Sequence, residues 1–519
     1  MPRRDGAEFV VSASQGRAGL LVSPTPQSVG GDPAPIVVSF RIILGETMSK
    51  SIPPLDLMWL VMETPESPTH VGALLLFDKP RGRPGVVHEI VEAYRAATPT
   101  PPFNYIAEAG GASVPRFREA TAYDACYHVQ HLALPAGASD DDLLRLVATL
   151  HEPMLDRGRP LFRMWLIDKV PGNRFAVYTK VHHAIVDGVS GTRRLYGSLS
   201  NSARRSIPTP AFAAEVAVRK PRPPKALVDR LAEFGVTATK QTLALREVSV
   251  GALKKGLASL LGADPVGSAP FTAHRGPMNE PMQQARSIAT LSLPLDQMHA
   301  VGKHFGATLN DLSVTIVDEG VHRYLRQGGR AFPHRLVAFC PVSLRDDGDT
   351  ASGTRASAMF VHLGEHEATV VERIGQVVAA MGVAKQELRS MSKDAAMVYA
   401  VAVLGVAELT TSTHVDRVTS PLANMVISNV PGGRERLYLN GAALAGTFPV
   451  SAIAMSVGLN VTLTSYHESM DFGFVANGAA MHDMPALAHH VEDAYRELLA
   501  ATKRRIPRRS ASRARTRKK

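Results

Sequence analysis

Two adjacent histidines followed by Asp-Gly are the residues of this sequence best suited to chemistry. They lie in the segment VHHAIVDG, which runs from Val181 to Gly188. A neutral imidazole with a pKa near 6.5 is suited to take a proton from a weak nucleophile at physiological pH. We therefore interpret His183 as a candidate general base. Asp187 is expected to hold the turn through a cap or an ion pair, with Arg345 as one candidate partner, and not to transfer protons.

A pair of histidines is, taken alone, more often part of a core than of an active site. The segment HHVED at His489–Asp493 provides a contrast, because it lies inside a helical pattern, lacks an Asp-Gly turn and is expected to form a solvated face. In VHHAIVDG the pair ends a strand, where successive side chains point to opposite faces. One imidazole is then presented and its neighbour is packed away, so the full His-His-x-x-x-Asp-Gly spacing favours chemistry.

Several common catalytic motifs do not occur in the sequence. It has no GxSxG nucleophile elbow, no GxxxxGK[ST] phosphate loop, no HExxH zinc helix and no GxGxxG fingerprint. The base at His183 is therefore expected to act on a substrate hydroxyl or amine, or on water. No metal ion or bound cofactor is indicated.

The elements that would position these residues follow a mixed α/β pattern. Residues 162–168 and 174–182 alternate as an antiparallel hairpin around a Pro-Gly-Asn turn, and the histidine pair stands where the second strand ends. Gly188 relaxes the following turn, and Asp187 lies where a helix begins, so its charge meets the helix dipole favourably. Further strands are expected at 71–78, 127–134, 286–295, 335–343, 424–430, 459–465 and 471–477, and helices at 83–97, after Ser139 and at 485–505.

Length and composition indicate a globular protein with more than one domain. The chain has 519 residues, of which 45% are apolar and 20% charged, and one hydrophobic core rarely supports that length. A basic, proline-rich stretch, RKPRPPK at 219–225, divides the patterned segments. The sequence predicts an extension without sustained pattern at 1–47, a first domain at 48–200, a linker with helices at 201–285, a second domain at 286–502 and a basic tail at 503–519.

The formal net charge of +11 is concentrated in that tail. Residues 503–519 hold ten basic residues and no acid, which leaves about +1 for the rest of the chain. A tail of this kind suits anionic lipid headgroups, or it is simply disordered. No specific nucleic-acid partner is predicted.

Cysteine usage and hydropathy indicate a protein of a reducing interior. The two cysteines, Cys126 and Cys340, have no CxxC spacing, and no signal peptide is visible at the start of the sequence. The longest apolar run, Ala395–Ala407, is shorter than the roughly 20 residues that a membrane-spanning helix needs. It is expected to form a core helix, with an interfacial helix as the alternative.

The segment VHHAIVDG resembles the active-site motif of the CoA-dependent acyltransferase superfamily. From about Pro54 to Leu499 the chain is similar, more narrowly, to the bacterial wax ester synthase/diacylglycerol acyltransferase family. The blocks that carry this resemblance are PLDLMWLVMETPESPTHVG, RPLFRMWLID, TLNDLSVTIV, PVSLR and SNVPG. The sequence departs from the family pattern at Phe162, where tryptophan is usual, at Thr354, where asparagine is expected, and at Cys126, where the family tends to have an acid.

The resemblance implies a fold, a reaction and a location. The fold would be α/β, with two chloramphenicol-acetyltransferase-like domains, mixed sheets and an interdomain channel. The reaction would join an acyl group from the cosubstrate acyl-CoA to diacylglycerol or a long-chain fatty alcohol. The protein would be cytoplasmic and peripheral to the inner membrane face or lipid droplets.

The resemblance also assigns roles to single residues. His183 would be the base, with His182 and Asp187 in the same motif, and Asn310 would donate to the oxyanion or shape the site. Asp311 is expected to be mainly structural. The candidates for lining the substrate channel are Gly188, Asp311, Pro160 and Leu161.

Two other functions remain open at the level of sequence. One is an acyltransferase of the same superfamily that serves another acceptor or takes its acyl group from a carrier-protein thioester. The other is a catalytically silent lipid-binding protein. The presence of His183, Asp187 and Asn310 argues against the silent protein.

Overall fold

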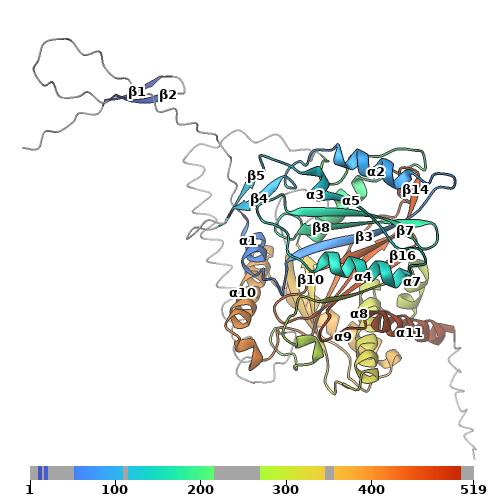
Figure 1. Cartoon of the computed structure of the whole chain (residues 1–519). Coiled ribbons are helices and arrows are strands. Elements are labelled where there is room, and N and C mark those ends of the chain that lie inside the picture. The colour runs from blue at the N-terminus through green and yellow to red at the C-terminus, as the bar shows by residue number, and fades with distance from the viewer. Residues whose placement is uncertain are drawn as a thin grey trace, which may run out of the picture. The chain divides into compact units, whose positions relative to one another are not determined.

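The computed structural model of the chain consists of two units, which we describe separately (Figure 1). In the unit of residues 1–48, strands β1 (Val10–Ser14) and β2 (Arg17–Leu21) form an antiparallel hairpin. The unit of residues 49–519 holds everything that follows. The linker around Arg219, the residues Arg345 and Thr354, and the tail beyond Lys503 lie outside the described residues, which are 10–14, 17–21, 52–108, 115–214, 269–344 and 356–503.

The first of two six-stranded sheets carries the histidine motif. Its order is β13-β14-β3-β8-β7-β6, with β6 parallel to β7 and the other pairs antiparallel. The predicted hairpin is confirmed, and Gly172 and Asn173 both take positive φ in its turn. The strands are β3 (His70–Asp78), β6 (Val129–Ala133), β7 (Phe162–Val170), β8 (Arg174–His182), β13 (Tyr438–Leu439) and β14 (Ala442–Val450).

The second sheet is also mixed and has the order β11-β10-β12-β15-β16-β9. The pairs β10/β12 and β12/β15 are parallel, and the others are antiparallel. Although β14 lies late in the chain, it pairs with β3 in the first sheet, so that sheet is not built from one contiguous segment. The strands are β9 (Arg286–Pro294), β10 (Val337–Ser343), β11 (Ala356–His362), β12 (Met425–Val430), β15 (Leu459–Tyr466) and β16 (Ser469–Asn477).

Helices cover the sheets and begin at side-chain caps. Ser139 caps α4 and forms a capping box with Asp142, as the serine and the acids after it predicted. Thr308 and Asp311 make the same box on α8. The helices that enclose the sheets are α2 (Val86–Arg95), α4 (Asp140–His151), α7 (Leu295–His304), α8 (Leu309–Gln327), α9 (Val370–Arg389) and α11 (Met484–Lys503). On α11, His489 is exposed, which confirms the solvated face expected for the second histidine pair.

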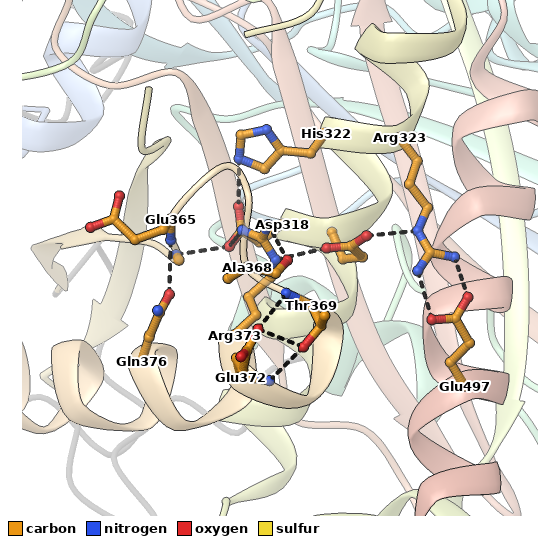
Figure 2. Close-up of polar contacts among 12 residues, drawn as sticks. Asp318, His322, Arg323, Glu365, Ala368, Thr369, Glu372, Arg373, Gln376 and Glu497 are labelled. Carbon is orange, nitrogen blue, oxygen red and sulfur yellow. Dashed lines mark hydrogen bonds and ion pairs between the residues drawn. The ribbon is translucent and has the colours of Figure 1, made fainter. Parts of the chain in front are cut away.

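A buried ionic cluster joins α8, α9 and α11 (Figure 2). Arg373 is fully buried and donates from Nη1 to Asp318 Oδ2 and from Nε to Glu319 Oε2, both at 2.8 Å. Glu319 also accepts from Arg323 Nε at 2.7 Å, and Arg323 forms a bidentate pair with Glu497 at 2.9 Å. A continuous chain of ion pairs therefore connects the three helices.

Four further α-helices and a separate strand pair also belong to the described part of this unit. The helices are α1 (Pro54–Val61), α3 (Ala125–His128), α5 (Gly188–Gly197) and α10 (Lys393–Ser412), and the short strands β4 (Tyr105–Glu108) and β5 (Arg116–Glu119) form the pair. Among the helices that the structure describes, α10 alone is long and apolar enough to cross a membrane, with 39% of its most apolar window buried. One face of α10 packs in the core, while Leu409 on the other is 62% exposed, so the helix is both a core helix and a surface helix.

Candidate functional site

The two sheets face each other across a cavity of about 640 Å³. Strands β3, β7, β8 and β14 line it from the first sheet, and β10, β11, β12 and β15 line it from the second. Helices α1, α5 and α10 and several connecting segments also contribute to the lining. His183, Asp187 and Gly188 of the histidine motif all lie on the wall of this cavity.

His183 follows the last residue of β8, so the end of a strand fixes its position. Its ring stacks on Trp59 of α1, with ring centroids 4.1 Å apart and planes 21° apart. Its backbone N–H donates to the carbonyl oxygen of Thr69 at 3.0 Å. Nδ1 is buried beside the backbone of the same residue without a well-formed hydrogen bond, whereas Nε2 has no protein partner among the described residues and is not one of the buried unpaired atoms. Nε2 is therefore the ring nitrogen that opens to the cavity.

Burial lowers the pKa of His183 to about 4. The backbone of the same residue and the charge of Asp187 act in the opposite direction, and His182 adds a further lowering. The ring is thus neutral throughout the physiological range, which is the protonation state that a base needs. Sequence alone suggested an ordinary pKa near 6.5, and the difference comes from burial beside Trp59.

His182 is packed behind the cavity wall, as strand alternation predicted. It is fully buried, and its Nδ1 accepts from the backbone N–H of Ala184 at 3.1 Å. Its Nε2 lies 3.3 Å from Thr69 Oγ1 and 3.4 Å from Glu63 Oε2. His182 therefore orients the motif from behind and does not line the cavity.

Glu63 is a buried carboxylate that joins His182 to an arginine. Arg157 donates to Glu63 Oε2 from Nε at 3.1 Å and from Nη2 at 2.9 Å, and the backbone N–H of Thr69 donates to Oε1 at 3.2 Å. Burial raises the pKa of Glu63, but the hydrogen bonds and charges of His182 and Arg157 outweigh it, so the net shift is downward. The carboxylate is therefore held charged beneath the histidine pair.

Asp187 is the N-cap of α5. Its Oδ1 accepts from the backbone N–H of Ser190 at 2.7 Å, which confirms the cap that the sequence predicted. Asp187 also lies on the cavity wall. Capping fixes the turn, and the wall position follows because α5 starts at the cavity.

The structure brings only part of the predicted set to the cavity. Gly188 lines it, and a Cβ there would meet Val430 Cγ2 of the second sheet at 3.3 Å. Asp311 instead caps α8 and pairs with Lys385 at 2.9 Å. Leu161 is buried and its carbonyl oxygen accepts from the backbone N–H of His182. The predicted residues that are not among those lining the cavity are His182, Asn310, Asp311, Pro160 and Leu161.

Sequence reasoning gave no role to Trp59, Glu63, Thr69 or Arg157. The first three lie in the block PLDLMWLVMETPESPTHVG, which carried the family resemblance without any assigned chemistry. Glu63 and Arg157 are 94 residues apart, so no local pattern joins them. In the described residues there is no group of three or more His, Cys, Asp or Glu side chains that could hold a metal ion.

Comparison with protein families decides the classification. Residues 52–313 match the wax ester synthase/diacylglycerol acyltransferase catalytic domain, and residues 352–499 match the WS/DGAT C-terminal domain. The chain belongs to the wax ester synthase/diacylglycerol acyltransferase family. The resemblance seen in the sequence is thereby confirmed over both halves of the chain.

Individual members of the family agree with this classification. A probable diacylglycerol O-acyltransferase of Mycobacterium tuberculosis, Tgs4, is 33% identical over 86% of this chain and 96% of its own length. The O-acyltransferase WSD of Acinetobacter baylyi is 30% identical over 85% of this chain and 95% of its own length.

Solved structures confirm the α/β fold with two mixed sheets. The wax ester synthase/diacylglycerol acyltransferase from Marinobacter aquaeolei superposes with a TM-score of 0.67 at 26% identity, covering 87% of this chain and 100% of that one. The first condensation domain of the calcium-dependent antibiotic synthetase gives a TM-score of 0.51 at 16% identity, covering 88% and 97%. The second likeness concerns the fold alone.

Proposed function

We propose that this protein is an acyl-CoA-dependent O-acyltransferase that esterifies diacylglycerol or a long-chain alcohol, with His183 as the general base. One observation carries the proposal: a neutral imidazole exposes Nε2 to a largely apolar cavity between two sheets. Membership of the family implies acyl-CoA as the donor. The name of the relative Tgs4, a probable diacylglycerol O-acyltransferase, supports the first acceptor class, and the wax ester synthase in the name of the family supports the second.

In the proposed reaction, His183 carries one proton from the acceptor hydroxyl to the departing thiolate. His183 Nε2 takes the proton of the acceptor hydroxyl while that oxygen bonds to the thioester carbonyl carbon. The carbon–sulfur bond then breaks, and the imidazolium returns the proton to the departing thiolate. General base catalysis of this kind contributes about 10²–10⁴ in rate, so positioning and electrostatic stabilisation must supply the rest.

Two side chains are proposed to support the base without transferring protons. Asp187 holds the start of α5, which keeps the turn after His183 in place. Asn310 is on the first turn of α8 and is not among the residues lining the cavity, which favours a role in shaping the site over direct contact with the oxyanion.

We further propose that the enzyme works at the surface of a membrane or lipid droplet on the cytoplasmic side. The described segments leave an apolar surface at the end of α10 and at the adjoining η2 (Val415–Arg417), where Leu409 and Val418 are exposed. The inner face of α10 contributes Ala400 and Leu404 to the cavity. A lipid acceptor could therefore pass from a lipid surface to the cavity along α10. Co-sedimentation of a Leu409→Asp variant with anionic vesicles tests whether the exposed end of α10 contacts lipid.

Incubation of the purified protein with palmitoyl-CoA and either dipalmitoylglycerol or hexadecanol tests the function. We expect acceptor-dependent release of CoA thiol and an ester product on thin-layer chromatography. His183→Ala is expected to reduce thiol release by about 10²–10⁴. His489→Ala, an exposed histidine on α11, is the matched control. Undiminished release from a His183→Ala protein with an unchanged circular dichroism spectrum would exclude this base.

A further inference from the structure

Strand β15 buries a polar face. Its sequence LNVTLTSY alternates, and Leu459, Val461 and Leu463 enter the main core of the second sheet. Such alternation usually places the polar face in water. Here Asn460 and Thr464 on the other face are buried as well, and they line the cavity.

Strand β12 adds one polar residue to this face, Ser428, which stands between Val426 and Val430. Ser428 pairs with Thr462 across the two parallel strands, and Val430 pairs with Thr464. Because strand residues rise about 3.3 Å each, the face from residue 460 to residue 464 spans roughly 13 Å. We call Ser428, Asn460, Thr462 and Thr464 the polar wall; all four line the cavity.

Strands β3, β7 and β8 of the first sheet present a different surface, while β14 of the same sheet adds Thr447 to the lining. Thr179 is the polar exception among side chains that β3, β7 and β8 contribute to the lining, and it is next to Ala73 and Met164 in the strand register. The apolar liners from these three strands are Val71, Ala73, Phe162, Met164 and Val181. An acyl chain fits this apolar wall, whereas the polar wall requires a ligand with hydrogen-bonding groups.

Part of the polar wall is satisfied within the protein. Thr462 Oγ1 donates to Asn460 Oδ1 at 2.7 Å and lies 2.8 Å from Ser451 Oγ. Asn460 Nδ2 donates to the carbonyl oxygen of Ala452 at 3.0 Å. These bonds hold the middle of the wall in a fixed orientation.

Two cavity hydroxyls have no partner among the described residues. Thr464 is 2% exposed and Thr179 is 8% exposed, and the Oγ1 atom of each is buried without a hydrogen bond. The hydroxyl of Tyr196 lies close to those of Thr464 and of Thr447 on β14, but neither Tyr196 Oη nor Thr464 Oγ1 makes a well-formed hydrogen bond. A buried hydroxyl without a partner lowers stability. Both threonines line the cavity, so a ligand there that draws the hydroxyl towards itself by rotation about χ1 would recover that free energy.

We propose that the polar wall, through Thr464, binds the ester carbonyl groups of a glyceride acceptor and so selects diacylglycerol over a simple long-chain alcohol. This inference rests on the proposed function. A fatty alcohol has one polar group, which must reach His183, and it would leave the hydroxyl of Thr464 unpaired. Diacylglycerol has two ester groups beside its free hydroxyl, and their carbonyl oxygens accept hydrogen bonds. Sites built around such bonds discriminate strongly against ligands that lack the acceptor.

The deciding variant is Thr464→Val, which keeps the shape of the side chain and removes the hydroxyl. With palmitoyl-CoA as donor, we expect kcat/KM for dipalmitoylglycerol to fall about tenfold. We expect kcat/KM for hexadecanol and the KM for palmitoyl-CoA to stay within about twofold, and Thr464→Ser to restore the diacylglycerol value. Thr290→Val on edge strand β9, which is not among the residues lining the cavity, is the matched control. If Thr464→Val does not fold, Ser428→Ala is measured in the same way.

Each other outcome has a definite meaning. Equal losses for both acceptors with a raised KM for palmitoyl-CoA would place the hydroxyl against the amide-bearing pantetheine arm and overturn the acceptor assignment. Unchanged kinetics for both acceptors would overturn the inference and leave the proposed function standing. A wild-type protein that releases no thiol with either acceptor would overturn both.

Discussion

The ionic cluster and the polar wall differ in whether their buried polar groups have partners within the protein. In the ionic cluster of Figure 2, Arg373 faces two carboxylates, and Arg323 joins one of them to Glu497. In the polar wall of the cavity, the hydroxyl of Thr464 has no partner. An unpaired buried ion costs far more free energy than an unpaired buried hydroxyl. The charges of this cluster are therefore paired within the protein, whereas the fold tolerates the unpaired hydroxyl of Thr464.

The comparison predicts its largest effect on stability at Arg373. Replacing Arg373 by Met would leave Asp318 and Glu319 buried without their shared cation, and loss of one partner from a buried pair typically costs about 3–5 kcal/mol. We expect the free energy of unfolding, measured by urea denaturation, to fall by that amount. The partly exposed Arg323→Met is the control and should cost about 1 kcal/mol or less. Similar values for the two variants would show that burial does not separate them.

Glu63 shares a feature with each region, because it is charge-paired like the cluster and lies next to the histidine motif that reaches the cavity. Glu63→Gln keeps the shape but removes the charge that Arg157 and His182 share. We expect a loss of about 1–3 kcal/mol in stability together with about a tenfold fall in kcat and little change in the KM for palmitoyl-CoA. The exposed Glu66→Gln is the control. Lost stability with an unaltered kcat would limit Glu63 to a structural role.

The parts of the fold that were predictable are those with local signals. The hairpin of β7 and β8 was predicted because alternating strands flank a Pro-Gly-Asn turn, and α4 because Ser139 precedes three acids. Strand β14 was missed. Its sequence AALAGTFPV has few β-branched residues, contains a register shift at Gly446, and is held in place by β3, some 370 residues earlier in the chain.

The candidate site divides in the same way. Strand alternation was enough to separate the cavity-facing His183 from the packed His182. It could not reveal Glu63 or Trp59, whose contacts with the motif come from distant segments. Alternation also identified β15 as a strand, but a polar face that turns to water and one that turns to an internal cavity have the same sequence pattern.

The first sheet and the ionic cluster are expected to respond differently to acid, because their buried groups change stability in different ways as the pH falls. Burial, with the nearby charge of Lys180, holds the pKa values of His70 and His151 well below 6.5. As the pH falls below 6.5, the two histidines become protonated in the unfolded chain but stay neutral in the folded protein. Each histidine therefore lowers the free energy of unfolding by about 1.4 kcal/mol per pH unit. In the cluster, burial raises the pKa of Asp318 to about 6 and lowers that of His322 to about 4. Asp318 gains stability as pH falls through 6 while His322 loses it, so the two oppose each other between pH 6 and 4.

Melting temperatures measured from pH 7.5 to 5 should therefore depend on the first sheet. We expect the wild-type melting temperature to fall steadily below pH 6.5. His151→Gln should make that fall shallower, because one of the groups that resist protonation is gone, even though the variant loses the bond to the Tyr178 hydroxyl and starts from a lower value. His322→Gln should make the dependence of the melting temperature on pH slightly shallower between pH 6.5 and 6. Below pH 6 the variant should gain stability relative to the wild type, because protonation of Asp318 stabilises the fold and His322 no longer offsets that gain. If His151→Gln kept the full wild-type slope, the acid sensitivity would have to arise outside this histidine pair, and the contrast between the two regions would not extend to pH.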